Sequence, residues 1–206
     1  MSADQPAATR APRLGTAQRT ALLVGAALFT LGLGLVVALL GELQDVFGFP
    51  TWGLGLIAGT SFLAGFAGNL TLGPIADRGY ARTMLVSSVV VGVVALLWLA
   101  AATKLWEFVA ARAIFGLADG AFFPAARRLM ITGRPDRPGA ELGALMGAAI
   151  GGFLSGPVVG GLLAEAFGLR VAFIAPAIAL SAAVPIMLRL PPPVPLAGPR
   201  STQLSL

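Results

Sequence analysis

The sequence contains no cysteine and no histidine among its 206 residues. Without cysteine, the chain has no disulfide framework and no thiol chemistry. Without histidine, it lacks the residue most often used for metal binding and for acid–base chemistry near neutral pH. It also has no G-x-x-x-x-G-K-[ST] phosphate-binding loop, so we do not expect ATP to be its energy source. These absences argue against hydrolytic and metal-dependent enzymes, and we expect no metal, no cofactor and no enzymatic activity.

Charged residues are also scarce, at 11% of the chain, whereas 57% of the residues are hydrophobic. The mean hydropathy is +0.87, which is far above that of a soluble domain. Each of the long apolar stretches contains about 20 residues, the length that an α-helix needs to cross a bilayer. The short alternating segments typical of transmembrane strands do not occur. The sequence therefore predicts an all-α membrane protein with six transmembrane helices, at residues 20–41, 53–76, 84–103, 105–127, 142–166 and 169–190.

The basic residues are distributed unevenly between the two ends of these predicted helices. Lys104 and Arg170 fall on one side, and Arg112 lies within a helix. The other eleven basic residues fall on the opposite side; they are Arg10, Arg13, Arg19, Arg78, Arg82, Arg127, Arg128, Arg134, Arg137, Arg189 and Arg200. By the positive-inside rule, this side and both termini are cytoplasmic. The net charge of +5 is therefore explained by topology and predicts no nucleic-acid partner.

Three regions follow from this pattern. Residues 1–19 are rich in alanine, proline and arginine and are predicted to form a disordered cytoplasmic tail. Residues 20–190 form the six-helix transmembrane domain, which places the protein in the lipid bilayer as a multi-pass integral protein of the plasma (cell inner) membrane. Residues 191–206 begin with three prolines that stop the last helix, and are predicted to form a proline-rich C-terminal tail.

The connector between the second and third predicted helices carries the string GPIADRGYAR, residues 73–82. This string resembles the G-x-L-A-D-R-x-G-R-R hallmark of the major facilitator superfamily, with Gly73, Asp77, Arg78 and Arg82 in matching positions. Tyr80 and a neighbouring alanine depart from it. A carboxylate beside arginines at a helix end can change partners when helices rock, which predicts a cytoplasmic gating loop. The simpler alternative is that the arginines only anchor the helix ends and that Asp77 is solvated.

The fourth predicted helix carries two charged residues, Arg112 and Asp119. A charge near the bilayer centre costs about 2.5–3.5 kcal/mol on insertion scales, so both should face protein or water. Seven residues separate them, which places them on nearly the same face but about 10 Å apart along the axis, too far for a direct ion pair. Gly116 lies between them and leaves room for a ligand or for a neighbouring backbone.

We therefore expect Arg112, Gly116 and Asp119 to line a central transport cavity, with Asp119 as a candidate protonation site. The run from Arg112 to Gly116 resembles the R-x-x-x-G pattern of the same superfamily, which implies a role for Arg112 in proton handling. The resemblance does not extend to Asp119. The alternative is that both charged side chains make polar contacts between helices that only fix the packing.

The fifth predicted helix is rich in glycine. Glycine repeats at intervals of four allow helix backbones to approach closely in a membrane, and proline removes a backbone donor and loosens the helix. The pattern ends in G-P-x-x-G-G and resembles the antiporter motif of drug:proton exchangers of the superfamily. It implies an antiporter-type hinge, although a simple packing face is the alternative; the hinge residues are Gly147, Gly151, Gly152, Gly156, Pro157, Gly160 and Gly161.

The resemblance covers residues 20–190 and implies the N-terminal six-helix half, built from two three-helix units, of a major-facilitator-type bundle. We expect a half-size or truncated secondary transporter that exports a small molecule in exchange for protons. Its transport path would be completed by a homodimer or by a separately encoded second half. The alternative is a non-transporting membrane remnant or accessory subunit with the same fold. A membrane enzyme is the third and weakest hypothesis.

Overall fold

The structure, a computed structural model, describes residues 14–190, and within this range every regular element is a helix. The helices are α1 (Thr16–Ala38), α2 (Leu40–Phe47), α3 (Thr51–Ile75), the π-helical segment η1 (Ala76–Tyr80), α4 (Ala81–Ala101), α5 (Leu105–Gly133), α6 (Pro138–Phe167), α7 (Leu169–Ser181) and α8 (Val184–Met187). This confirms the predicted all-α class. The predicted tail residues 1–13 and 191–206 lie outside the described range.

Five helical stretches in the described range are long and apolar enough to cross a membrane. One of them, Thr51–Ala101, runs through α3, η1 and α4 and therefore contains both the second and the third predicted spans. The chain turns within it at Gly79, whose φ is +98°. A left-handed φ of this kind is accessible to glycine at little cost. The predicted gating loop is therefore a π-helical turn. Gly79, the glycine at this turn, lies one residue before Tyr80, which occupies the position of the second glycine in the hallmark pattern.

Two helix boundaries differ from the prediction at the N-terminal side of their helices. α1 begins at Thr16, so residues 16–19 are helical and do not belong to the predicted disordered tail. Gln18 explains the early start, because its side-chain oxygen accepts a hydrogen bond from the backbone N–H of Gly15 at 3.0 Å. α6 likewise begins at Pro138, four residues before the predicted span. Proline is favoured in the first helical turn because its missing N–H would have no partner there.

Two further boundaries differ at the C-terminal side. α5 continues to Gly133, six residues beyond the predicted end, so Arg128 is a helical residue and not part of a connector. The predicted sixth span is divided into α7 and the short α8. Pro185 causes this division, because it has no N–H to donate to the carbonyl four residues earlier.

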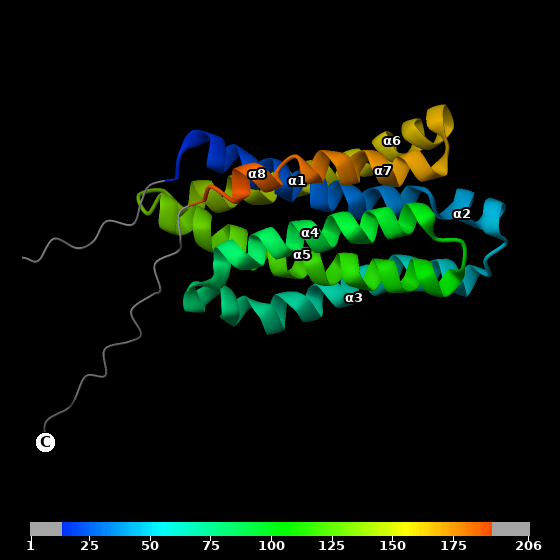
Figure 1. Ribbon diagram of the computed structural model, residues 1–206, viewed down its shortest axis with the longest axis horizontal. Coiled ribbons are helices and arrows are strands. Elements are labelled where there is room, and N and C mark those ends of the chain that lie inside the picture. Colours follow the sequence, from blue (N-terminus) through cyan, green and yellow to red (C-terminus); the bar gives the residue numbers. More distant parts are fainter. Residues whose placement is uncertain (1–13, 191–206) are drawn as a thin grey trace, which may run out of the picture.

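Successive long helices run antiparallel, and both ends of the described chain lie at the same end of the bundle, on the left in Figure 1. The turn at η1 and the α5–α6 connection lie at this end as well. We call it the basic end, and define it by residues 14–19, 76–82, 127–141 and 187–190. The opposite end holds α2 and the α4–α5 and α6–α7 connections (Figure 1).

The most extensive helix contacts join α1 to α6 and α3 to α5, and α4 packs against both α5 and α7. Exchanging the first three spans with the last three replaces α1 by α5, α3 by α6 and α4 by α7, and the reverse. Under this exchange the α1–α6 pair becomes the α5–α3 pair, and the α4–α7 pair is unchanged. The pairing therefore agrees with the predicted arrangement of two three-helix units. The core between them contains the rings of Phe29, Phe115 and Phe122, with Phe29 5.6 Å and 4.9 Å from the other two ring centroids.

Candidate functional site

Arg112 is fully buried on α5, among the largest buried side chains of the described bundle. Its Nε donates a hydrogen bond to the backbone carbonyl of Ile57 on α3 at 3.1 Å. The Nη1 and Nη2 atoms are also buried, and neither makes a hydrogen bond to any of the described residues. A buried guanidinium with unsatisfied donors is costly, so this charge favours an anionic or polar partner.

Asp119 lies two turns further along α5 and lines a cavity of about 270 Å³ between α5 and α3. Ser61, Gly65 and Asn69 form part of its wall on the α3 side. The Oδ1 atom of Asp119 is buried, and it has no hydrogen-bond donor among residues 14–190. The carboxyl group is thus held at a cavity without a protein partner for one of its oxygens.

The two charged residues of α5 do not line the same cavity, although the sequence predicted that they would. Arg112 does not line the cavity beside Asp119, and no ion pair joins the two side chains in the described part of the chain. Gly116 does not line this cavity either. A Cβ atom at Gly116 would lie 2.1 Å from the carbonyl oxygen of Ser61, so its space is taken by a neighbouring backbone and not by a ligand.

Glycines on both helices bring α3 and α5 close together around this site. A Cβ at Gly120 would lie 2.3 Å from the carbonyl oxygen of Gly65, and one at Gly68 would lie 3.2 Å from that of Leu117. Lipid provides no hydrophobic drive for helix association, so such close van der Waals contacts are a main source of it. The small residues fix the distance between α3 and α5, the helix that carries both charged side chains.

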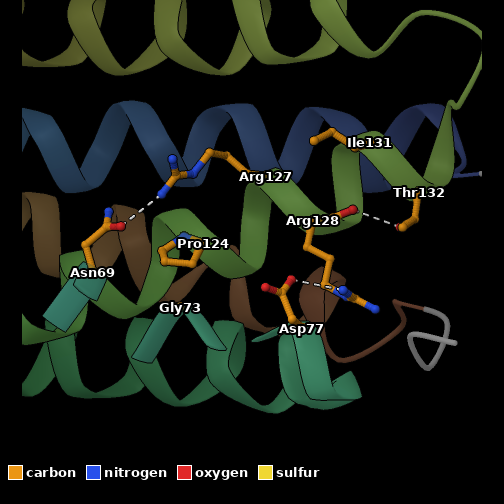
Figure 2. A pocket seen from close by; sticks show the side chains of 8 residues that line it. All are labelled: Asn69, Gly73, Asp77, Pro124, Arg127, Arg128, Ile131 and Thr132. Atoms are coloured by element: carbon orange, nitrogen blue, oxygen red, sulfur yellow. Dashed lines mark hydrogen bonds and ion pairs between the residues drawn. The ribbon is translucent and has the colours of Figure 1, made fainter. Parts of the chain in front are cut away.

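A second polar cluster lies at the basic end, where Figure 2 shows side chains of α5 meeting those of α3 and η1. Arg128 Nη1 donates to Asp77 Oδ1 at 3.0 Å, and Arg127 Nη2 donates to Asn69 Oδ1 at 3.1 Å. These residues and Gly73 line a cavity of about 370 Å³. Asn69 belongs to the walls of both this cavity and the one beside Asp119.

The remaining residues of the predicted gating loop point elsewhere. Arg78 is exposed, and Arg82 donates a hydrogen bond to the backbone carbonyl of Leu188 after α8. Asp77 therefore pairs with an arginine of α5 that the sequence analysis counted only as a topology signal. α5 continues through Pro124 to Gly133, and this places Arg128 beside Asp77.

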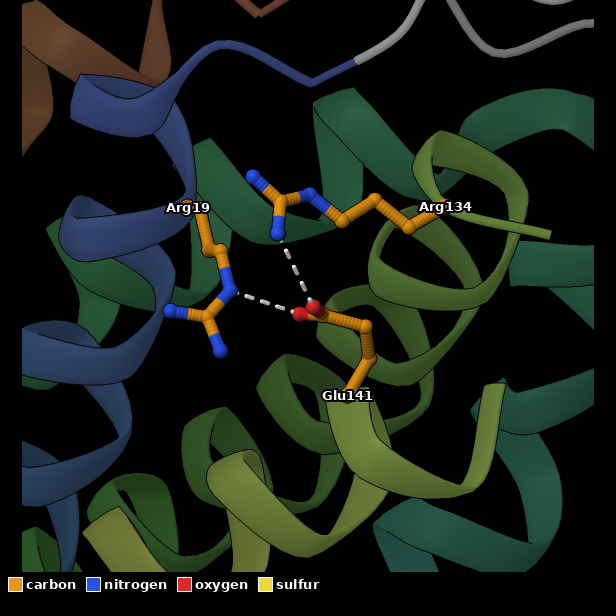
Figure 3. A network of polar contacts seen from close by, with 3 residues as sticks. All are labelled: Arg19, Arg134 and Glu141. Carbon is orange, nitrogen blue, oxygen red and sulfur yellow. Dashed lines mark hydrogen bonds and ion pairs between the residues drawn. The ribbon is translucent and has the colours of Figure 1, made fainter. Parts of the chain in front are cut away.

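Glu141, a buried acid in the first turn of α6, was not among the predicted site residues. Figure 3 shows this carboxylate between two arginines from other parts of the basic end. Glu141 Oε2 accepts from Arg19 Nε of α1 at 2.7 Å, and Oε1 accepts from Arg134 Nη1 at 3.5 Å. One acid thus joins the start of α1, the end of α5 and the start of α6. Its position directly after a connector with several arginines was the available sequence signal.

The glycines of the predicted antiporter-type hinge fall into two groups. Gly152, Gly156 and Gly160 face α1, where an added Cβ would lie 2.0–2.7 Å from atoms of that helix. In contrast, a Cβ added on the other face would have open space around it; this holds for Gly147, Gly151 and Gly161. The first group is a contact ridge, and the second lies on a face of α6 that no other described helix covers.

α6 continues through Pro157 as one helix, so the hinge itself stays a prediction. Pro157 cannot donate to the carbonyl of Phe153. That carbonyl faces Gly34 of α1, where an added Cβ would lie 2.2 Å from its oxygen. Nearby, Thr30 Oγ1 donates across the interface to the carbonyl of Ala149 at 2.6 Å. α6 therefore packs tightly against α1 at the position where Pro157 removes one of its backbone hydrogen bonds.

Comparison with known proteins gives a consistent result. The profile of the Major Facilitator Superfamily matches residues 22–205. The chain is 38% identical over 120 residues to "Multidrug resistance protein MdtG" of Serratia proteamaculans (strain 568), and 36% identical over 120 residues to the proteins of the same name from Enterobacter lignolyticus (strain SCF1) and Yersinia enterocolitica serotype O:8. Each match covers 58% of this chain but only 28–29% of the relative.

Proposed function

Because the chain belongs to the Major Facilitator Superfamily, we propose that it is part of a secondary transporter that exports a small amphipathic molecule in exchange for protons. The similarity to proteins named for multidrug resistance supports this substrate class. Since the matched segment spans under a third of those relatives, the activity of the whole relatives is carried to this chain only as part of the proposal.

The observation that carries the proposal is the carboxyl group of Asp119, which lines a cavity with one oxygen buried and without a donor in the described bundle. A charge at membrane depth is costly, so binding a proton there would change the stability of the site by a large amount. A carboxyl group that alternates between charged and neutral forms can couple proton movement to a conformational change. Asp119 is the proposed proton carrier, and buried Arg112 tunes the electrostatic potential around it.

The remaining parts of the proposed cycle use contacts between helices. The Asp77–Arg128 pair at the basic end is the proposed gate, because an ion pair at a helix end can break and re-form as helices rock. The contact ridge of α6 on α1 is the proposed hinge, which lets α6 move while Gly152 and Gly156 keep it close to α1. A second six-helix unit, from a second copy or a separately encoded chain, completes the path.

The orientation is part of the same proposal. We place the protein in the cell inner membrane with the basic end and both termini on the cytoplasmic side, as the positive-inside rule predicts. The cavity that Asp77 and Arg128 line then faces the cytoplasm. Asn69, which belongs to both cavity walls, stands between this cytoplasmic cavity and the one beside Asp119.

The test uses the purified full chain in liposomes, alone and together with a second six-helix unit, with an imposed pH gradient. A fluorescent amphipathic dye should move in response to the gradient, and Asp119→Asn should abolish this movement because the amide cannot release a proton. Asp45→Asn, an exposed acid at the opposite end of the bundle, is the matched control and should transport like the wild type.

Two results would contradict the proposal. Gradient-driven movement by Asp119→Asn at the wild-type rate would assign Asp119 a structural role only. Absence of transport by the wild type in every combination would favour the alternative of a non-transporting protein with the transporter fold. Circular dichroism of each variant should confirm that the helical content is unchanged.

A further inference from the structure

A groove on the outside of the bundle runs along the first part of α4, beside the end of α8. Its volume is about 640 Å³, which makes it larger than the cavities beside Asp119 and Asp77. Neither Asp119 nor Asp77 lines it. The groove is therefore separate from the proposed transport site.

The walls of the groove change from polar to apolar along α4. The polar side chains of the groove, Arg82, Thr83 and Ser87, lie toward the basic end with Val86 and Leu188 beside them. Only the apolar side chains of Val90 and Val91 lie deeper. Nine residues of helix separate Arg82 from Val91, which corresponds to about 14 Å along the axis. This length is close to half of a hydrocarbon core of about 30 Å, so the groove extends through roughly one leaflet.

The guanidinium of Arg82 is held at the polar end by its hydrogen bond to the carbonyl of Leu188. This carbonyl is available because it follows the last turn of α8, where backbone carbonyls have no donor within the helix. Arginine has five N–H donors in a planar fork, and this bond uses one of them. Such a fork is well suited to bind phosphate oxygens in pairs.

From this arrangement we propose that the groove binds one anionic glycerophospholipid. Its phosphate would be bound by Arg82 and the hydroxyl of Thr83, and one acyl chain would lie on Val90 and Val91. The hydroxyl of Ser87 already donates to the carbonyl of Met84 at 3.1 Å and only adds polarity to the wall. The charge is complementary, because a basic side chain stands where the headgroups of a bilayer begin and an apolar surface continues from it toward the membrane centre. Val90 and Val91 are both exposed large apolar side chains, which is the condition for contact with lipid.

The test measures lipids that stay bound to the full chain in a neutral detergent, by native mass spectrometry. Phosphatidylglycerol and phosphatidylcholine with identical acyl chains are added in equal amounts. The wild type should retain phosphatidylglycerol about fivefold better, which corresponds to the attraction between one basic side chain and an anionic membrane surface. Arg82→Gln should remove this preference. Arg78→Gln is the matched control, because it removes the same charge from an exposed residue that does not line the groove.

A second variant tests the apolar part without changing the charge or the Arg82–Leu188 bond. Val90→Trp should fill the groove and reduce retention of both lipids, and it changes an already exposed position.

Glycerol phosphate, which has the headgroup without acyl chains, should fail to displace phosphatidylglycerol at equal concentration. Equal retention of the two lipids by the wild type would overturn the proposal, as would equal losses in Arg82→Gln and Arg78→Gln. Displacement by glycerol phosphate alone would show that the site binds free phosphate groups. A dimer that is abolished by Val90→Trp would show that another copy of the chain occupies the groove. Either result overturns the lipid assignment.

Discussion

Glu141 Oε2 accepts a hydrogen bond from Arg19 Nε at 2.7 Å, although 122 residues separate the two in the sequence. The side chain of Glu141 is 5% exposed, whereas that of Arg19 is 28% exposed, so the acid is the buried member of the pair. This contact, together with that to Arg134, ties three helix ends at the basic end of the bundle (Figure 3).

We expect Glu141→Gln to lower the free energy of unfolding by about 2 kcal/mol, because removing a buried charge leaves its partners uncompensated, although their partial exposure reduces the cost. The measurement is thermal unfolding of the purified chain in one detergent. Glu165→Gln, which changes an exposed acid on the same helix, should leave the unfolding temperature unchanged. Equal effects of the two variants would show that the contacts of Glu141 contribute no stability.

The two groups of α6 glycines should respond differently to alanine. In Gly156→Ala, the new Cβ would meet backbone atoms of α1 at 2.6–2.7 Å, so we expect a loss of about 1–3 kcal/mol. In Gly147→Ala, the new methyl group meets open space, and stability should be unchanged or slightly higher. Alanine raises helix propensity at both positions, so the difference between the two unfolding temperatures reports the contact itself. If Gly147→Ala destabilises as much as Gly156→Ala, the contact ridge is misassigned.

Asp77→Asn should have little effect on the stability of the protein but a large effect on its transport rate. The side chain of Asp77 is 68% exposed, so its pair with Arg128 should contribute less than about 1 kcal/mol to stability. Under the proposed gating role, the same variant should slow dye transport several-fold, because the interaction that changes between conformations is weakened. The two measurements are the unfolding temperature and the initial transport rate in liposomes. A large loss of stability with unchanged transport would contradict the gating role.

The absence of cysteine from the chain makes its orientation testable with single cysteines. Thr103→Cys lies at the end opposite the basic end and should react with a membrane-impermeant maleimide in intact cells. Ala140→Cys lies at the basic end and should react only after the membrane is permeabilised. Both positions are exposed, so the two variants are intended to differ only in the side of the membrane on which the cysteine lies. The reverse labelling pattern would place the basic end outside the cytoplasm.

The sequence was sufficient for the features that depend on local physical chemistry. An apolar run of about 20 residues predicts a membrane-spanning helix whatever its neighbours are. Glycine spacing likewise predicted a close-packed α6, since a repeat of four residues brings small positions to one helix face. Helix boundaries were less predictable, because Thr16 and Pro138 begin their helices through capping and first-turn effects that a hydropathy pattern does not contain.

Contacts between distant segments could not be predicted in this way. The sequence suggested that Arg112, Gly116 and Asp119 share one cavity because they share one face of α5. The backbone of α3 fills the space at Gly116 and leaves Asp119 alone at the cavity. Similarly, nothing in the local pattern indicated that Asp77 would pair with Arg128.

By itself, the sequence determined that this is an all-α membrane protein with six spans, because burial of apolar side chains in lipid and hydrogen bonding within a helix are satisfied one segment at a time. Only the tertiary structure decided which charges meet, which glycines contact α1, and which cavity Asp119 lines. Those outcomes depend on the distance and rotation between helices, which are set by packing over the whole bundle and are not encoded in any single segment.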